Sequence, residues 1–437
     1  MLINFQFRNF CAFRDSTEFT MIASEESTER ESLVPVITQN DMNLLPIAAL
    51  FGGNASGKSC FCRALEALQN LIVKGEWKGE AFRTTEGSGD TVSFLINVLS
   101  ENEVWEYEVE ISGKEIAQES LKQILAKHEE VVFVREGKKI KVSDSLFPDE
   151  KDKERIKLSA EICGKDTPYM SFCRKLEMPS LLKWVEPFYR WIANRLLVLA
   201  PDSLHVSIGM EVFTHKDKFE ELLRTADTGI DGLEFTRVDL PSLNIPEHIL
   251  QKFKDQDLKE AQAMMLQASL QAPSGIVFKR AEKEGANLEA YRIETIHQDS
   301  RKGEKVPFTF AEESDGTRRL LHLLPLVTAT GEGKVIVADE IDRSLHPHLA
   351  RYVLEKYKER NIELAKQGKA GQLIFTTHDA LLMSKELLRT DEIWITERQA
   401  DHSSRLIPLS DFVEAQSDSD IYKSYLLGRM GGVPNIY

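Results

Sequence analysis

The stretch that decides the fold is Gly52-Gly53-Asn54-Ala55-Ser56-Gly57-Lys58-Ser59. It fits the pattern G-x-x-x-x-G-K-[ST] of phosphate-binding P-loops, in which a glycine-rich turn joins a strand to a helix. Residues 45–51 form an apolar run typical of a buried strand, and apolar residues repeat at helical spacing over residues 61–72. The order of strand, glycine turn and helix predicts an α/β nucleotide-binding fold.

Each residue type in this motif has a chemical task. Glycines let backbone N–H groups turn inward toward a phosphate, and the N-terminus of the following helix adds positive dipole character. We expect Lys58 to reach the β- and γ-phosphates and the Ser59 hydroxyl to ligate Mg²⁺. The expected nucleotide contacts are Gly52, Gly53, Asn54, Ala55, Ser56, Gly57, Lys58, Ser59 and Cys60.

Two further apolar runs end in residues that suit phosphate chemistry. Residues 334–340 read as a strand that ends in two acids, of which Asp339 would assist the metal and Glu340 would polarise the attacking water. Residues 372–376 read as the next strand, and His378 follows it closely, where it could bind the γ-phosphate or hold the water. A lone histidine is more often structural, but its place one strand after the acids favours a functional role.

A fourth segment, residues 312–321, precedes a leucine-rich helical pattern. Ser314 and Gly316 at a helix start would present a hydroxyl and free N–H groups to an anion. A serine cap before such a helix is common, so this pattern is weak on its own.

Strand patterns surround the P-loop. Alternating apolar residues over 3–21 predict a strand pair that feeds the sheet holding the P-loop, and antiparallel hairpins are expected at 91–111 and 129–142. Helical patterns extend from about residue 143 to 194, and residues 196–199 are predicted to form a strand.

These patterns divide the chain into three parts. Residues 1–142 would form the N-terminal half of an ATPase core with a β subdomain, and residues 143–274 a mainly helical insertion that includes a helix at 247–270. Alternation returns after residue 274, so residues 275–437 would form the C-terminal half of the core.

The composition excludes some classes of protein. Hydrophobic residues make up 42% of the 437 residues, yet no stretch approaches about 18 apolar residues in a row and no signal peptide is apparent, so we expect a cytoplasmic protein without a membrane span. The net charge of −15 argues against broad adhesion to nucleic acid. The odd number of cysteines suggests free thiols at Cys11, Cys60, Cys62, Cys163 and Cys173.

Together the motifs resemble the ABC-type ATPases, in the branch of SMC, RecF and OLD-like proteins rather than transporters. More narrowly, the chain is similar to the RloA/AbiL-type ATPases of bacterial abortive-infection and restriction-linked loci. The segments that carry these resemblances are Phe5-Gln6-Phe7-Arg8-Asn9-Phe10, the P-loop with its Asn54, Glu313-Ser314-Asp315-Gly316-Thr317, Asp339-Glu340-Ile341-Asp342-Arg343-Ser344-Leu345-His346-Pro347, and residues 425–434.

The resemblance implies a fold and a set of contacts. The fold would be an ABC-ATPase-like P-loop core with a mixed β-sheet, an antiparallel β subdomain and the inserted helical lobe. The nucleotide would be ATP with Mg²⁺, and Ser314 and Gly316 would contact the γ-phosphate of ATP held by a second protomer. Ser344 would belong to the loop between the two sites, and His378 would be the switch histidine.

The chain departs from the wider pattern at several positions. His346 stands where transporters usually carry an aspartate, and Cys60 where such ATPases often have asparagine. Cys11 occupies the place of an arginine of some SMC-type relatives. The glutamine of the Q-loop and the adenine contacts are therefore left unassigned.

These features predict an ATPase that forms ATP-sandwiched dimers within a homo-oligomer and controls a separate effector in anti-phage defence. The stretch after His378 is short for a nuclease domain, so we expect a partner chain to supply the toxin or nuclease. A RecF-like DNA-repair ATPase is an alternative, which the acidic charge disfavours. A slowly hydrolysing scaffold that cages a partner is another.

Overall fold

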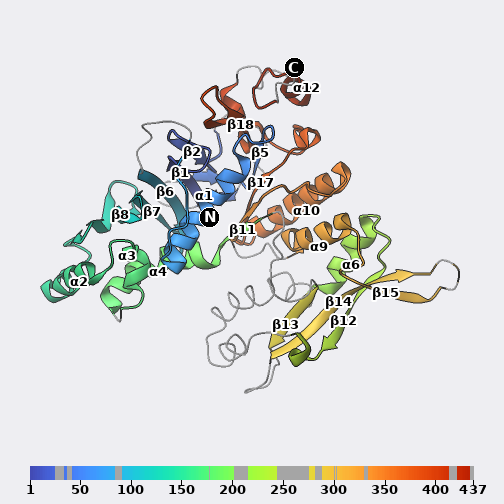
Figure 1. The fold of residues 1–437 in the computed structure, drawn as a ribbon, viewed down its shortest axis with the longest axis horizontal. Coiled ribbons are helices and arrows are strands. Elements are labelled where there is room, and N and C mark those ends of the chain that lie inside the picture. The colour runs from blue at the N-terminus through green and yellow to red at the C-terminus, as the bar shows by residue number, and fades with distance from the viewer. Residues whose placement is uncertain are drawn as a thin grey trace. The chain divides into compact units, whose positions relative to one another are not determined.

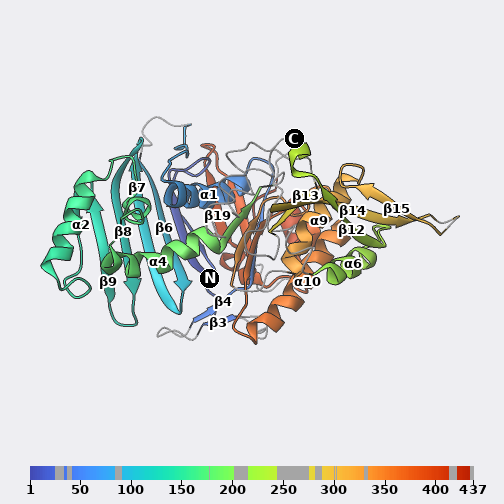
Figure 2. The same ribbon diagram turned by 90° about the horizontal axis from the view of Figure 1, so that it is seen from below.

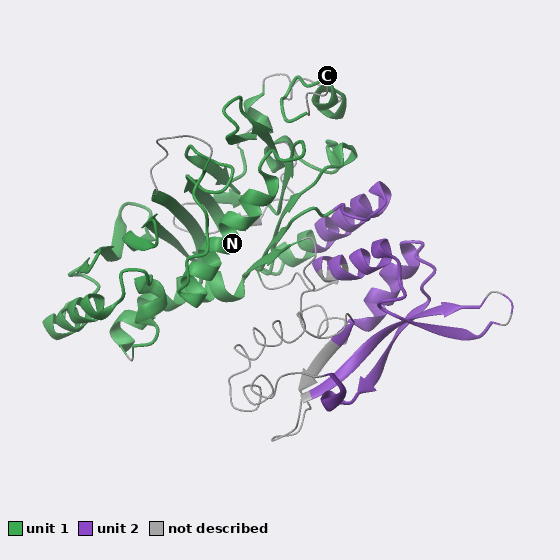
Figure 3. Cartoon of the chain, in the orientation of Figure 1, with its two compact units in different colours: residues 1–200, 331–341, 361–437 green, residues 201–330, 342–360 purple. Residues whose placement is uncertain are grey.

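The computed structural model divides the chain into two compact units (Figure 3). The first contains residues 1–200, 331–341 and 361–437, and the second contains residues 201–330 and 342–360. The structure describes residues 1–24, 34–36, 42–83, 91–176, 178–200, 215–243, 275–280, 288–299, 301, 303–328, 333–412 and 421–433.

The first unit is built on a six-stranded sheet (Figure 1). All neighbouring pairs are parallel except the last, β18 with β19. The central strands β16, β17 and β5 are buried and almost wholly apolar, as expected of parallel strands covered on both faces. The order of the strands is β11 (Leu196–Leu199), β16 (Val335–Ala338), β17 (Gln372–Thr376), β5 (Ile47–Phe51), β18 (Ile393–Arg398) and β19 (Ser404–Pro408).

The helix α1 (Lys58–Lys74) follows the P-loop directly, as the sequence predicts. It ends at Gly75, whose left-handed backbone lets its N–H reach the Leu71 carbonyl. Its buried face carries apolar residues at helical spacing: Phe61, Cys62, Ala64, Leu65, Leu68, Leu71 and Ile72.

The first unit also contains a seven-stranded antiparallel sheet, which forms its β subdomain. Here the prediction for residues 3–21 was wrong, because β1 and β2 join this sheet rather than the sheet that holds the P-loop. Alternation identifies strands but not their partners, and β1 pairs with β6, placing Phe5 opposite Ile96. The order is β10 (Lys139–Lys141), β9 (Glu129–Glu136), β8 (Glu115–Ile124), β7 (Glu103–Ser112), β6 (Thr91–Ser100), β1 (Leu2–Arg8) and β2 (Thr17–Thr20).

Aromatic packing joins α1 to this antiparallel sheet. The ring of Phe61 lies 5.9 Å from Phe5, 6.1 Å from Phe7 and 4.9 Å from Phe19, in edge-to-face arrangements. Such pairs each contribute about 0.5–1.5 kcal/mol beyond burial. The start of α1 is therefore fixed by side chains from the N-terminal strands.

The helices expected between residues 143 and 194 pack in the first unit. They are α2 (Glu150–Ile162), α3 (Tyr169–Cys173) and α4 (Pro179–Asn194), and α4 contacts α1 and β6. Residues 143–200 fall within the first unit, and apolar side chains of these three helices are part of its core. The three-part division itself stays a prediction, and the helix expected at 247–270 lies outside the described residues. Shorter elements of the unit are β3 (Val34–Val36), β4 (Met42–Leu44) and α12 (Ile421–Leu426).

The second unit contains a small antiparallel sheet and helices (Figure 2). Its strands are β12 (Gly232–Val238), β14 (Leu288–Gln298), β13 (Ile276–Arg280) and β15 (Lys305–Thr309), with β14 central. Its helices are α6 (Lys216–Thr225), α9 (Asp315–Thr328) and most of α10 (Pro347–Ala365). In the part of the chain that the structure describes, no helix combines the length and apolar character needed to cross a membrane.

A fully buried polar network ties the antiparallel sheet to α3. The Glu119 carboxylate on β8 accepts hydrogen bonds from the backbone N–H groups of Tyr169 (2.5 Å) and Met170 (2.8 Å) and from the Tyr107 hydroxyl (2.9 Å). The Arg135 guanidinium on β9 lies 3.7 Å away, and neither charged side chain is exposed. Burial raises the pKa of Glu119, and these partners oppose that shift.

Replacing Glu119 should destabilise the first unit strongly. In Glu119→Ala the buried Arg135 charge loses its counter-charge, and we expect the free energy of unfolding to fall by about 3–5 kcal/mol. Denaturant unfolding would measure this loss. Glu115→Ala, which removes a carboxylate with 61% of its side chain exposed, should change stability by no more than about 0.5 kcal/mol. Equal effects of the two changes would contradict the role given to the network.

Candidate functional site

Three neighbouring parallel strands of the first unit bring the predicted site residues of that unit to one edge of its sheet. β17 pairs with β5 on one side and with β16 on the other, both in parallel. Their carboxyl ends therefore lie together. The P-loop follows β5, Asp339 and Glu340 follow β16, and His378 follows β17 at this edge.

The P-loop needs glycine at its two ends. Gly52 has φ +153° and Gly57 has φ +109°, in the region that favours residues without a Cβ. A Cβ atom on Gly52 would lie 2.3 Å from the Thr396 hydroxyl oxygen. Between them Asn54 and Ala55 are exposed, and Ala55 also has positive φ.

Thr396 holds the loop from the neighbouring strand β18. Its hydroxyl donates to the Phe51 carbonyl (3.1 Å) and lies 2.5 Å from the Ser56 hydroxyl. Ser56 is buried, so its side chain is used to fix the loop. Thr396 was missed in the sequence; its only signal is a polar residue after the apolar Ile393-Trp394-Ile395.

Lys58 reaches back over the P-loop. Its ammonium donates to the carbonyls of Gly52 (2.7 Å) and Gly53 (2.9 Å), and it lies 3.3 Å from Nδ1 of His378. At the helix start, Gly57 carries no side chain that could satisfy the first N–H groups of α1. A helix N-terminus beside a lysine is a suitable place for phosphate.

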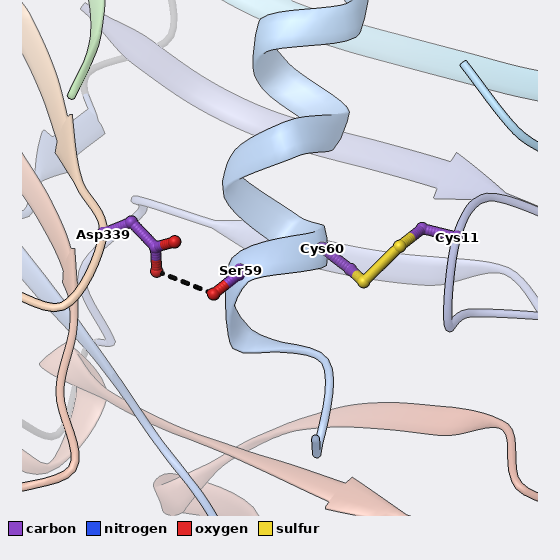
Figure 4. The surroundings of a disulfide bond; sticks show 4 residues. All are labelled: Cys11, Ser59, Cys60 and Asp339. Atoms are coloured by element: carbon purple, nitrogen blue, oxygen red, sulfur yellow. Dashed lines mark hydrogen bonds between the residues drawn. A yellow bond between two sulfur atoms is a disulfide. The ribbon is translucent and has the colours of Figure 1, made fainter. Parts of the chain in front are cut away.

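Ser59 and Asp339 supply the two expected ligands of a magnesium ion. The Ser59 hydroxyl donates to Oδ1 of Asp339 at 3.1 Å (Figure 4), and only 6% of Asp339 is exposed. Mg²⁺ bound with a nucleotide usually takes one or two protein oxygens and completes its shell with phosphates and water. These two side chains therefore fit the ion that the motif implies.

The Thr376 hydroxyl links Asp339 to Glu340. This residue was not among those predicted for the site. Its hydroxyl donates to Oδ1 of Asp339 (2.6 Å) and accepts from the backbone N–H of Glu340 (2.8 Å). Glu340 has φ +48°, an uncommon conformation for this residue type. Since Thr376 is simply the last residue of a predicted strand, no local pattern marks it.

Glu340 and His378 form a partly exposed pair. Oε1 of Glu340 lies 3.9 Å from Nε2 of His378, and about a third of each side chain is exposed, 32% and 38%. The imidazole contacts Lys58 through its other nitrogen. A carboxylate and an imidazole in this arrangement can orient a water molecule and accept its proton.

The expectation of five free thiols is wrong at Cys11 and Cys60, which form a disulfide with each other. Figure 4 shows the Cys60 side chain leaving α1 on the opposite side from Ser59. The partners are 49 residues apart in sequence, and packing of the turn after β1 on α1 brings their Cα atoms to 5.9 Å. Cysteine number alone cannot show such a contact.

The signature residues come together in the second unit. The Ser314 hydroxyl caps α9 by accepting from the N–H of Thr317 (3.1 Å), as the sequence predicts. A Cβ atom on Gly316 would lie 2.9 Å from the Ser344 carbonyl oxygen, so this glycine permits close approach of the two segments. Glu313, just before the signature, bonds to His297 (2.8 Å) and Thr295 of β14.

Removing the Thr376 hydroxyl should weaken magnesium binding. In Thr376→Val both Asp339 and the Glu340 N–H lose a hydrogen-bond partner, and we expect the Mg²⁺ concentration needed for nucleotide binding to rise about 10- to 100-fold. Titration of Mg²⁺ against a fluorescent ATP analogue would measure it. Thr376→Ser keeps the hydroxyl and should stay close to the unmodified chain. If the valine variant matched the serine variant, Thr376 would have no part in holding the acid.

A solved structure and a family model match this chain. The solved SMC head domain from Thermotoga maritima resembles the chain with a TM-score of 0.36 and 12% identity, over 93% of this chain and 98% of that one. This score is low, and no curated protein matches. A family model described as "AAA domain, putative AbiEii toxin, Type IV TA system" matches residues 47–384, which include the P-loop, both acids and His378. The chain belongs to this family of AAA-type P-loop proteins.

Proposed function

We propose that the protein binds ATP with Mg²⁺, hydrolyses it, and uses an ATP-sandwiched dimer to control a separate toxin or nuclease in anti-phage defence. The observation that carries the proposal is the convergence of four side chains at the carboxyl edge of parallel strands. They are Lys58, Asp339, Glu340 and His378.

Each of these residues has a task in hydrolysis. Mg²⁺, held by Ser59 and Asp339, would supply positive charge to the phosphates. Lys58 neutralises the β- and γ-phosphate oxygens, and the N–H groups at the start of α1 bind them. Glu340 orients the attacking water and accepts its proton, and His378 holds the water or the γ-phosphate.

The group of signature residues in the second unit supports the dimer. Ser314 caps the 14-residue helix α9, Gly316 is the second residue of that helix, and the Ser344 carbonyl lies close to Gly316. A hydroxyl and N–H groups at a helix start can bind an anionic group. In the proposed dimer this anion is the γ-phosphate of ATP bound to the P-loop of the partner, so that ATP joins two protomers.

Two resemblances support a role in a toxin-linked defence system. The description of the matching family names a putative AbiEii toxin of a type IV toxin–antitoxin system. The motifs are also similar to those of the RloA/AbiL-type ATPases of abortive-infection loci. The net charge of −15 disfavours the alternative of a RecF-like clamp on DNA. The other alternative is a scaffold that hydrolyses ATP slowly, and a measured hydrolysis rate would distinguish it from the proposed ATPase.

Slowing hydrolysis should trap the dimer. In Glu340→Gln the water is no longer activated, so ATP stays bound and the mass measured by light scattering should double with Mg²⁺-ATP, while turnover falls at least about 100-fold. Glu340→Gln/Ser314→Ala should bind ATP but stay at the lower mass. Ser242→Ala, which alters an exposed serine of the second unit, should have no effect in the same background.

Other results would redirect the proposal. An unchanged mass with ATP would contradict the ATP-sandwiched dimer and favour the scaffold. A DNA mobility shift that requires ATP and weakens with salt would favour the RecF-like alternative.

A further inference from the structure

The disulfide between Cys11 and Cys60 lies directly beside the nucleotide site. Cys60 is the third residue of α1 and follows Ser59, whose hydroxyl contacts Asp339 (Figure 4). Cys11 lies in the turn after β1, with φ +54°, and its N–H donates to the Glu80 carbonyl (2.9 Å). The bond therefore joins the first turn of the P-loop helix to a separate loop.

That loop also contacts the P-loop without covalent bonds. Phe10 and Phe13 exchange backbone hydrogen bonds (2.8 and 2.9 Å) that close the turn, and the Ala12 carbonyl accepts from the Ser404 N–H (2.8 Å). The Phe13 ring would lie 3.0 Å from a Cβ atom on Gly57. Residues 9–13 thus form a support, here called the N-terminal turn, that the disulfide fastens to the start of α1.

The other cysteines are poorly placed to react. Cys62, Cys163 and Cys173 are buried free thiols. Burial raises the pKa of Cys163 to about 11 and raises the pKa of Cys173 further, and the thiolate is the reactive form. Cys11 and Cys60 are only half-buried, so a reagent in solution reaches this pair first.

We propose that Cys11 and Cys60 form a thiol–disulfide exchange site that accepts a dithiol reductant and sets the affinity of the neighbouring P-loop for nucleotide. This inference rests on the proposed function of that loop. A thiolate of the reductant attacks one sulfur, forms a mixed disulfide and releases the other cysteine as a thiol. The second thiol of the reductant then displaces the remaining cysteine. Two electrons and two protons pass to the protein, and the reductant leaves as a disulfide.

The oxidised pair favours nucleotide binding because it orders the site in advance. With the bond closed, the first turn of α1 and Ser59 are held against the N-terminal turn. With the bond open, binding must order this turn, which costs conformational entropy. We expect reduction to raise the dissociation constant for Mg²⁺-ATP by about three- to tenfold.

The first test counts thiols and maps the bond. The chain purified in air should show no rapid reaction with an aromatic disulfide reagent, and two fast-reacting thiols after treatment with dithiothreitol. Mass spectrometry of a non-reduced digest should yield a linked peptide pair containing Cys11 and Cys60. Two reactive thiols in the air-oxidised chain, with no linked pair, would overturn the proposal.

The second test measures affinity for Mg²⁺-ATP in both redox states by calorimetry. Cys11→Ser should bind like the reduced chain and should no longer respond to the reductant, whereas Cys163→Ser should keep the full response. Equal affinity in both states would overturn the switch while leaving the proposed ATP site intact. Absence of ATP binding in both states would instead contradict the proposed function.

Discussion

The parallel pairing of β17 with both β5 and β16 is the constraint on which the site depends. It places three strand ends side by side, and Thr376, the last residue of β17, then links Asp339 to the backbone of Glu340. Without that central strand the P-loop and the acids would have no common frame. The chemistry therefore follows from the order of strands more than from any single side chain.

Rigid surroundings hold this frame in place. Thr396 on β18 fixes the P-loop from one side through Ser56 and the Phe51 carbonyl. Aromatic rings from β1 and β2 pack on Phe61 of α1. Since polar and charged groups at an active site must be positioned before the substrate arrives, such supports would bear on the proposed hydrolysis as much as on stability. The disulfide at Cys60 adds a covalent support to the same helix.

Local patterns predicted much of this structure. The P-loop, its flanking strand and helix, and the strands that lead to Asp339 and His378 are each marked by residue type and spacing over fewer than twenty residues. Ser314 as a helix cap was predicted in the same way. These features depend on neighbours in sequence, which a single chain displays directly.

The contacts that were missed join distant segments. Thr396 contacts Ser56, which lies 340 residues earlier in the sequence. The Cys11–Cys60 bond and the pairing of β1 with β6 likewise form only in the folded chain. Alternation in residues 3–21 could not show which of two sheets they would join. The roles assigned to the site residues stay predictions until they are measured.

The most direct measurement is the affinity for Mg²⁺-ATP, determined by calorimetry for the unmodified chain and for Lys58→Ala, which lacks the ammonium group. The account predicts one nucleotide per chain, bound in a magnesium-dependent manner, and loss of binding by at least about 100-fold in Lys58→Ala. If Lys58→Ala bound Mg²⁺-ATP as tightly as the unmodified chain, the loop would not be the nucleotide site, and the central claim would be wrong.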